Sequence, residues 1–138
     1  MDVDPTPATR RISGLVVLRG AATGLLVAMP AAFANVVYAA EVPKAAAAVN
    51  ISAFIVLLGF LLAGWLAGRE ASSEPARHGV LAALVAFIPV EVVAVLGRMD
   101  RGEPLSIPKI VIVGLFAAGL GSVGSRMGAA RRNKKEPT

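Results

Sequence analysis

One carboxylate stands inside an apolar stretch of the sequence, where a charged side chain is unexpected. Glu91 lies within an apolar run from about position 79 to position 97, and it follows Pro89. Proline lacks a backbone N–H, so a carbonyl one turn earlier loses its helical partner. An isolated charge in hydrocarbon costs several kcal/mol, so a carboxylate there must be protonated, bind a cation or meet a partner. Glu91 is therefore the first candidate for a functional residue.

Four further polar residues fall at the same depth when each apolar run is counted inward from the nearest loop. They are Asn35, Asn50, Ser52 and Lys109, and with Glu91 they form a candidate polar cluster in the outer third of the bilayer. We expect Glu91 to point into the helix bundle and to be met by Asn35 or Lys109. Two roles are open for it: a polar contact that fixes the register of the helices, or a proton or cation site that opens outward.

The residue types offer little for catalysis. The chain has no cysteine and one histidine, His78, and its serines lie at the ends of apolar runs without acidic neighbours. A nucleophile, a base and an orienting group cannot be assembled from these residues, and the sequence has no glycine-rich phosphate-binding motif. We therefore expect no enzyme activity, no metal and no cofactor. His78 is expected to be a solvated residue at the membrane surface.

The apolar runs predict the architecture. Hydrophobic residues make up 56% of the 138-residue chain, and the mean hydropathy is +0.70. A helix needs ~20 apolar residues to cross a bilayer, and four runs qualify, at about 13–40, 45–68, 79–97 and 107–129. The sequence thus predicts an all-α fold, with residues 1–138 as a single membrane domain of four transmembrane helices. A basic tail at 130–138 is expected to be unstructured and to lie near anionic headgroups.

The distribution of basic residues predicts the orientation. Ten Lys and Arg flank the runs on the side of the two termini, and four lie on the other side. Basic residues are retained in the cytoplasm, so both termini are expected there, in a multi-pass protein of the plasma (inner) membrane with the lipid bilayer as its partner. The basic residues lack the interleaved aromatic residues of a nucleic-acid-binding surface, so no nucleic acid is expected.

A signal peptide is the alternative interpretation of the first run. Arg10 and Arg11 precede the run, and Ala32-Phe33-Ala34 could serve as a cleavage site. Arg19, however, lies where a signal peptide should have an uninterrupted apolar core, and the apolar run continues past the candidate site. Both features favour a helix that remains part of the protein.

Small residues recur at four-residue spacing in the second and fourth runs. The candidate packing residues are Gly64, Gly68, Gly114, Ala118, Gly121, Ser122 and Gly124. Helices in lipid associate through close backbone approach at such positions. These residues are therefore expected to pack helices together, either within the chain or as a face reserved for another subunit, in a homo-oligomer or a larger membrane complex.

A weak internal repeat relates the two halves of the chain. Pro30 and Pro89 are 59 residues apart, and the segments Gly64–Arg69 and Gly121–Arg126 are 57 residues apart. The similar offsets suggest two similar helical hairpins, whose first helices would run in the same direction.

The ends of the later runs also carry a family resemblance. The second run closes on Gly68-Arg69, the third opens with His78-Gly79, and the fourth is glycine-rich and ends in arginine. Over residues 55–130 this pattern resembles small four-span bacterial membrane proteins of unknown function. The resemblance implies the four-span topology and brings with it no activity and no site residues.

Two classes of function are compatible with these features. The sequence favours a structural or accessory subunit that acts through helix packing, because four runs of Ala, Val, Leu and Gly offer few convergent polar groups. The alternative is a small transporter or channel with an outward-facing polar site around Glu91. A water-accessible cavity that reaches Glu91 would favour this alternative.

The orientation gives the first testable prediction. Gly102→Cys should react with a membrane-impermeant thiol reagent in intact cells, and Ser73→Cys should react only after the membrane is opened, because the basic residues hold Ser73 inside. The chain has no cysteine of its own, so each variant reports a single site. Labelling of Ser73→Cys in intact cells would contradict the predicted orientation.

Overall fold

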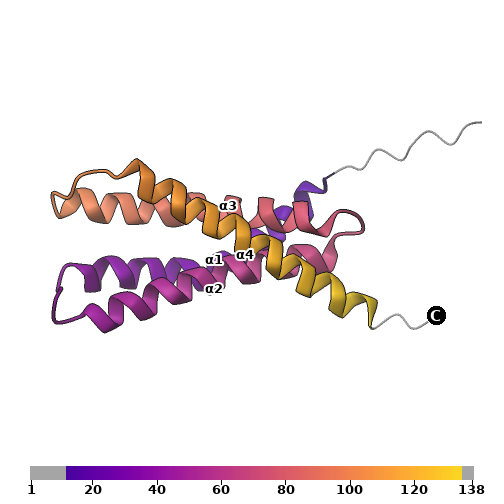
Figure 1. The fold of residues 1–138 in the computed structure, drawn as a ribbon, viewed down its shortest axis with the longest axis horizontal. Helices are drawn as coiled ribbons and strands as arrows, with labels where there is room; N and C mark the ends of the chain where they lie inside the picture. Colours follow the sequence, from indigo (N-terminus) through magenta and orange to yellow (C-terminus); the bar gives the residue numbers. More distant parts are fainter. Residues whose placement is uncertain (1–11, 135–138) are drawn as a thin grey trace, which may run out of the picture.

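The computed structural model describes residues 12–134, which form four α-helices joined by short loops (Figure 1). The helices are α1 (Gly14–Ala39), α2 (Ala46–Glu70), α3 (Pro75–Asp100) and α4 (Ile107–Asn133). Each helix is long and apolar enough to cross a bilayer, and the described part of the chain has no strand. The predicted all-α bundle of four candidate spans is therefore confirmed. The Arg10-Arg11 pair and the last four residues of the tail lie outside the described residues.

Helix α3 is longer at both ends than the apolar run that predicted it. It begins at Pro75, which suits a first helical turn because its missing N–H needs no partner there. It continues to Asp100, so that Arg98 belongs to the helix and not to the following loop. The prediction stopped at the last apolar residue, whereas charged residues extend the helix by one more turn.

The predicted basic tail is also partly helical, so its first residues were placed wrongly. Helix α4 continues to Asn133, four residues beyond the predicted end of the span. Arg132 donates a hydrogen bond from Nη1 to the backbone carbonyl of Ala71, the buried residue that ends α2. A carbonyl at a helix end needs a donor, and a guanidinium supplies one with a complementary charge. This contact ties the last turn of α4 to the α2–α3 connection.

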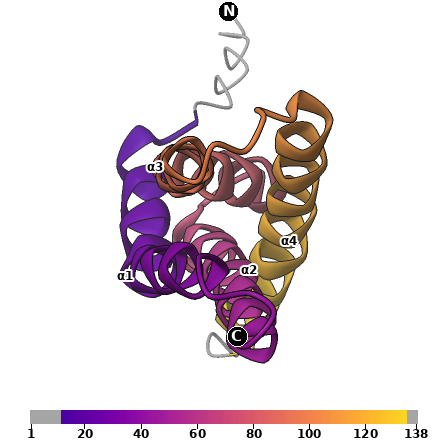
Figure 2. The same ribbon diagram turned by 90° about the vertical axis from the view of Figure 1, so that its left-hand side faces the viewer.

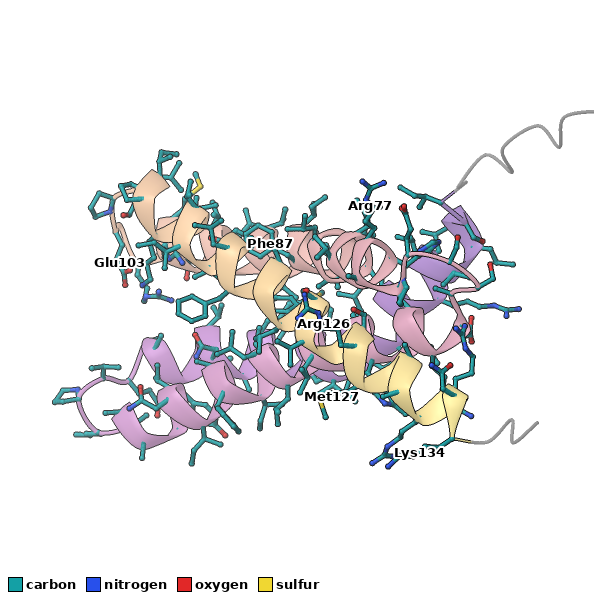
Figure 3. All side chains as sticks on the ribbon, turned by 45° about the vertical axis from the view of Figure 1, so that its right-hand side comes forward. Arg77, Phe87, Glu103, Arg126, Met127 and Lys134 are labelled. Carbon is teal, nitrogen blue, oxygen red and sulfur yellow. The ribbon has the colours of Figure 1, made fainter. Side chains whose placement is uncertain are left out.

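The helices form two antiparallel hairpins, α1–α2 and α3–α4, which converge at one end and diverge at the other (Figures 1 and 2). We call the end that carries the α1–α2 and α3–α4 loops the loop end, and the opposite end the terminal end. Helix α2 contacts each of the other three helices, whereas α1 and α4 do not touch within residues 12–134. Figure 3 shows Arg77 and Lys134 projecting outward at the terminal end, and it shows the position of Glu103 at the loop end.

Three helices meet backbone to backbone at the terminal end, at a contact that we call the glycine junction: Gly64, Gly68, Gly79, Gly121 and Ser125. A Cβ atom added at Gly64 would lie 2.6 Å from the Gly121 Cα, and one at Gly121 would lie 2.5 Å from the Gly79 carbonyl oxygen. No side chain fits at these distances, so only glycine permits the approach. The two segments of the weak repeat thus face one another, with Gly64 on Gly121 and Gly68 on Ser125.

The other predicted packing residues extend this contact along α4. Gly124 lies against the Leu61 carbonyl of α2, and Gly114 lies 3.6 Å, measured from a Cβ built on it, from the ring of Phe87. Ala118 and Ser122 are half-buried, and the Ser122 carbonyl accepts a 2.7 Å hydrogen bond from the Ser125 hydroxyl. Of the two packing modes left open by the sequence, the structure uses these small residues within the chain.

Two aromatic side chains lie where the hairpins begin to diverge. Phe60 on α2 is fully buried, and its ring meets that of Phe87 on α3 edge to face, with 6.2 Å between the ring centroids. Phe60 stands one turn from Gly64 toward the loop end. Because glycine gives way to large rings within one turn, α2 cannot remain in backbone contact with α3 and α4 beyond this point, although α2 still meets α1 closely at Gly59.

The glycine junction gives the second prediction. Gly121→Leu should lower the free energy of unfolding by about 1–3 kcal/mol or more, because the side chain would overlap the Gly79 carbonyl and the Ala83 methyl. Gly119→Leu is the matched control, since a Cβ at Gly119 meets nothing within 4 Å. Thermal unfolding in detergent checks both variants. Equal melting temperatures for Gly121→Leu, Gly119→Leu and the parent protein would contradict the junction.

Candidate functional site

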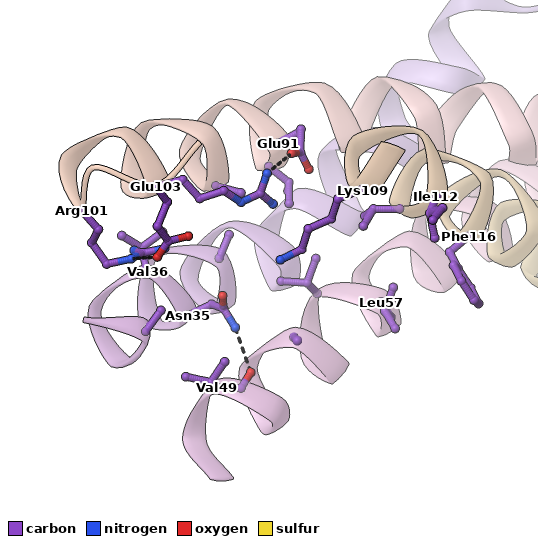
Figure 4. A pocket seen from close by; sticks show the side chains of 18 of the residues that line it. Asn35, Val36, Val49, Leu57, Glu91, Arg101, Glu103, Lys109, Ile112 and Phe116 are labelled. Atoms are coloured by element: carbon purple, nitrogen blue, oxygen red, sulfur yellow. Dashed lines mark hydrogen bonds and ion pairs between the residues drawn. The ribbon is translucent and has the colours of Figure 1, made fainter. Parts of the chain in front are cut away.

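A cavity of about 710 Å³ lies between the diverging hairpins at the loop end (Figure 4). All four helices and the α3–α4 loop contribute to its wall. Its volume is in the range of sites that hold drug-sized molecules, ~300–1,000 Å³. The cavity exists because the glycine junction draws α2, α3 and α4 together toward the terminal end, while Phe60 and Phe87 hold the hairpins apart on the side of the loop end.

Glu91 lines this cavity and is 8% exposed, so the prediction that it points into the bundle is confirmed. The prediction of its partner is wrong. The carboxylate pairs with Arg98 of the same helix, with 3.4 Å between Arg98 Nη1 and Glu91 Oε1, and not with Asn35 or Lys109. Seven residues are two helical turns, so both side chains share one face of α3, and the long arginine reaches back along it.

Asn35 joins α1 to α2 at the edge of the same cavity. Its side-chain N–H groups donate to the Val49 carbonyl at 2.8 Å and to the Ser52 hydroxyl at 2.9 Å. The Ser52 hydroxyl donates in turn to the Val49 carbonyl at 3.0 Å. Figure 4 shows the Asn35 amide nitrogen directed at Val49, with the amide oxygen on the cavity side. Of the five predicted polar residues, Glu91, Asn35 and Lys109 line the cavity. Ser52 accepts a hydrogen bond from Asn35, and Asn50 is exposed elsewhere on α2.

Two residues of the α3–α4 loop, which the sequence analysis did not select, complete the polar part of the cavity. Arg101 donates from Nε to Glu103 Oε1 at 2.7 Å. This hydrogen bond lowers the pKa of Glu103 below its ordinary value, and the positive charges of Arg101, Lys109 and Arg98 lower it further against a smaller opposing effect of desolvation. Glu103 is therefore ionised at neutral pH and holds the Arg101 side chain in place.

Two positive groups in the cavity keep donors without an acceptor. Arg101 Nη1 is buried and has no hydrogen-bond partner in the described structure. Lys109 is exposed at the mouth of the cavity, points into it, and makes no ion pair with any of residues 12–134. The cavity is thus lined by three cations, Arg98, Arg101 and Lys109, and by two carboxylates that are already paired.

No family model, curated protein or solved structure matches this chain. The resemblance to small four-span bacterial membrane proteins stays an expectation.

The deeper wall of the cavity is apolar. Val56 and Leu57 of α2, Val90 of α3 and Phe116 of α4 line it on the side of the glycine junction. The charged groups, apart from Glu91, come from the loop end of α3, the α3–α4 loop and the first turn of α4. The cavity is therefore amphipathic, with its charges at the mouth and its apolar surface toward the middle of the helices.

His78 lies at the opposite end of the bundle and is not the solvated residue that the sequence predicted. It is 2% exposed, Nε2 accepts a 3.0 Å hydrogen bond from the Ser13 backbone N–H, and Nδ1 lies 3.1 Å from the Glu74 carbonyl. Because Nε2 accepts, the proton is on Nδ1, which donates to Glu74. The ring joins the start of α1 to that of α3. Residues 12–134 contain no group of three potential metal ligands.

The Glu91–Arg98 pair gives the third prediction. Glu91→Gln and Arg98→Gln should each destabilise the protein, because each leaves a buried charge without its partner. The double variant should lose less than the two single losses together, with a coupling of about 1–3 kcal/mol. Chemical or thermal unfolding of all four proteins measures this coupling. Strictly additive losses would show that the two side chains do not interact.

Proposed function

We propose that the chain is a multi-pass membrane protein that binds a small molecule in the cavity between its hairpins, as a small transporter or solute-binding protein. One observation carries the proposal: a cavity of about 710 Å³ reaches Glu91 and combines an apolar wall with charged groups at its mouth. Ligand sites typically have this composition, a mostly apolar pocket with a few fixed polar groups. No catalytic role is proposed for any of the residues.

The proposed orientation places both termini in the cytoplasm and the loop end on the outer side of the plasma membrane. The ten-to-four distribution of Lys and Arg supports it. In this orientation the cavity opens away from the cytoplasm. At its inner end the glycine junction brings the backbones of α2, α3 and α4 into contact. Transport would require the two hairpins to move about this contact.

The other class of function, an accessory subunit that packs through its small residues, has less support. The residues that suggested a face for a partner, Gly64, Gly68, Gly121 and Gly124, lie against backbone of the same chain. They are therefore occupied already, and a homo-oligomer or a larger complex would have to use other surfaces. An assembly remains compatible with the proposal but does not follow from these glycines.

Water access to the cavity tests the proposed function and is the fourth prediction. Val113→Cys, on the cavity wall, should react with a charged, hydrophilic thiol reagent in membranes. Leu115→Cys is the matched control, because Leu115 lies two residues away on α4, is exposed on the outside of the bundle and does not line the cavity. In hydrocarbon a thiol stays protonated and unreactive. Equal protection of both cysteines would contradict a water-accessible binding cavity.

A further inference from the structure

The cavity has a side opening between α2 and α4. Ile112 and Phe116 of α4 line the cavity and are nevertheless 53% and 60% exposed, and Ala53 of α2 is likewise an exposed lining residue. On the opposite side α1 and α3 are in contact, since a Cβ at Gly97 would lie 2.5 Å from Val36. Figures 1 and 2 show α2 and α4 diverging toward the loop end. The opening therefore faces sideways out of the bundle, toward the lipid that would surround it.

The charge arrangement at the mouth favours an anion. Glu91 and Glu103 already have arginine partners, whereas Lys109 and the Nη1 group of Arg101 have none among the described residues. The buried Arg101 donor costs free energy without an acceptor, and a ligand oxygen would recover it once the guanidinium turns toward the cavity; Lys109 is exposed and meets such an oxygen directly. A second positive charge close by strengthens such a contact. A cationic ligand, in contrast, would meet three positive side chains and only two carboxylates, both of which are already paired.

From these two observations we infer that the cavity binds a single-chain anionic amphiphile. Its carboxylate or phosphate head would lie between Lys109 and Arg101, and its chain would lie on Leu57 and Phe116 and leave through the opening between α2 and α4. A cavity of this size accommodates one drug-sized molecule or one acyl chain, but not a two-chain lipid as a whole. This inference rests on the proposed function, because it names the ligand class of the same cavity.

Native mass spectrometry of the full chain, released from detergent, tests the inference. The probes are dodecanoate, dodecyl phosphate, dodecanol and dodecylamine, which have the same twelve-carbon alkyl group and differ in the charge of the head. We expect one dodecanoate or dodecyl phosphate per chain, bound at least about tenfold more tightly than dodecanol or dodecylamine. The better of the two anions identifies the head as carboxylate or phosphate.

Variants assign the binding to the proposed residues. Lys109→Gln and Arg101→Gln should each weaken dodecanoate about tenfold and leave dodecanol unchanged, and Lys109→Arg should retain binding. Lys44→Gln is the control, since Lys44 is an exposed cation in the other loop at the same end. Equal losses in Lys44→Gln and Lys109→Gln would overturn the inference by showing a general effect of surface charge.

The remaining outcomes separate the inference from the proposed function. Tighter binding of dodecylamine than of dodecanoate, lost in Glu91→Gln, would overturn the anionic ligand but keep the binding cavity. Inorganic phosphate is compared with dodecyl phosphate as a competitor of dodecanoate. Equal competition by the two would show that the dodecyl chain contributes nothing to binding, and would overturn the inference that the ligand is an amphiphile. Binding of none of the probes, together with protection of Val113→Cys, would overturn the proposed function itself.

Discussion

The structure depends on the backbone contact among α2, α3 and α4 at Gly64, Gly79 and Gly121. Apolar side chains give no driving force for helix association in lipid, because lipid tails are equally apolar. Close van der Waals contact between backbones is one of the few remaining sources of attraction, and it requires residues without side chains. Where large rings replace glycine on the facing sides of α2 and α3, at Phe60 and Phe87, α2 separates from α3 and α4. The cavity at the loop end follows from this change in side-chain size along α2 and α3.

The charged groups near the cavity follow a second constraint, the cost of an unpaired charge in a medium of low polarity. Glu91 meets Arg98 and Glu103 meets Arg101, so both carboxylates are neutralised by neighbours on or next to their own helix. These local pairs do not hold the two hairpins together. The hairpins can therefore diverge here without breaking an ion pair, and Lys109 faces the cavity without an ion pair to any described carboxylate.

Sequence reasoning predicted the helices well, because a length of apolar residues is a local property. It also predicted that Glu91 points into the bundle, since a carboxylate in an apolar run stands out without knowledge of the fold. The partner of Glu91 was missed because Arg98 was counted as part of a loop, although the seven-residue spacing could have indicated the pair. The burial of His78 and the side on which Asn50 points depend on the rotation of each helix. The hydrophobic pattern of a membrane helix barely encodes that rotation when lipid and core are both apolar.

The central claim is that α2 and α4 of one chain touch through their backbones at Gly64 and Gly121. Solid-state NMR on protein in bilayers tests it directly, with carbon-13 in the Gly64 α-carbon and the Gly121 carbonyl and with the labelled chain diluted into unlabelled protein. The structure predicts a dipolar contact between these two carbons that persists on dilution, because both belong to the same molecule. Loss of the contact on dilution, or its absence at any ratio, would contradict the account.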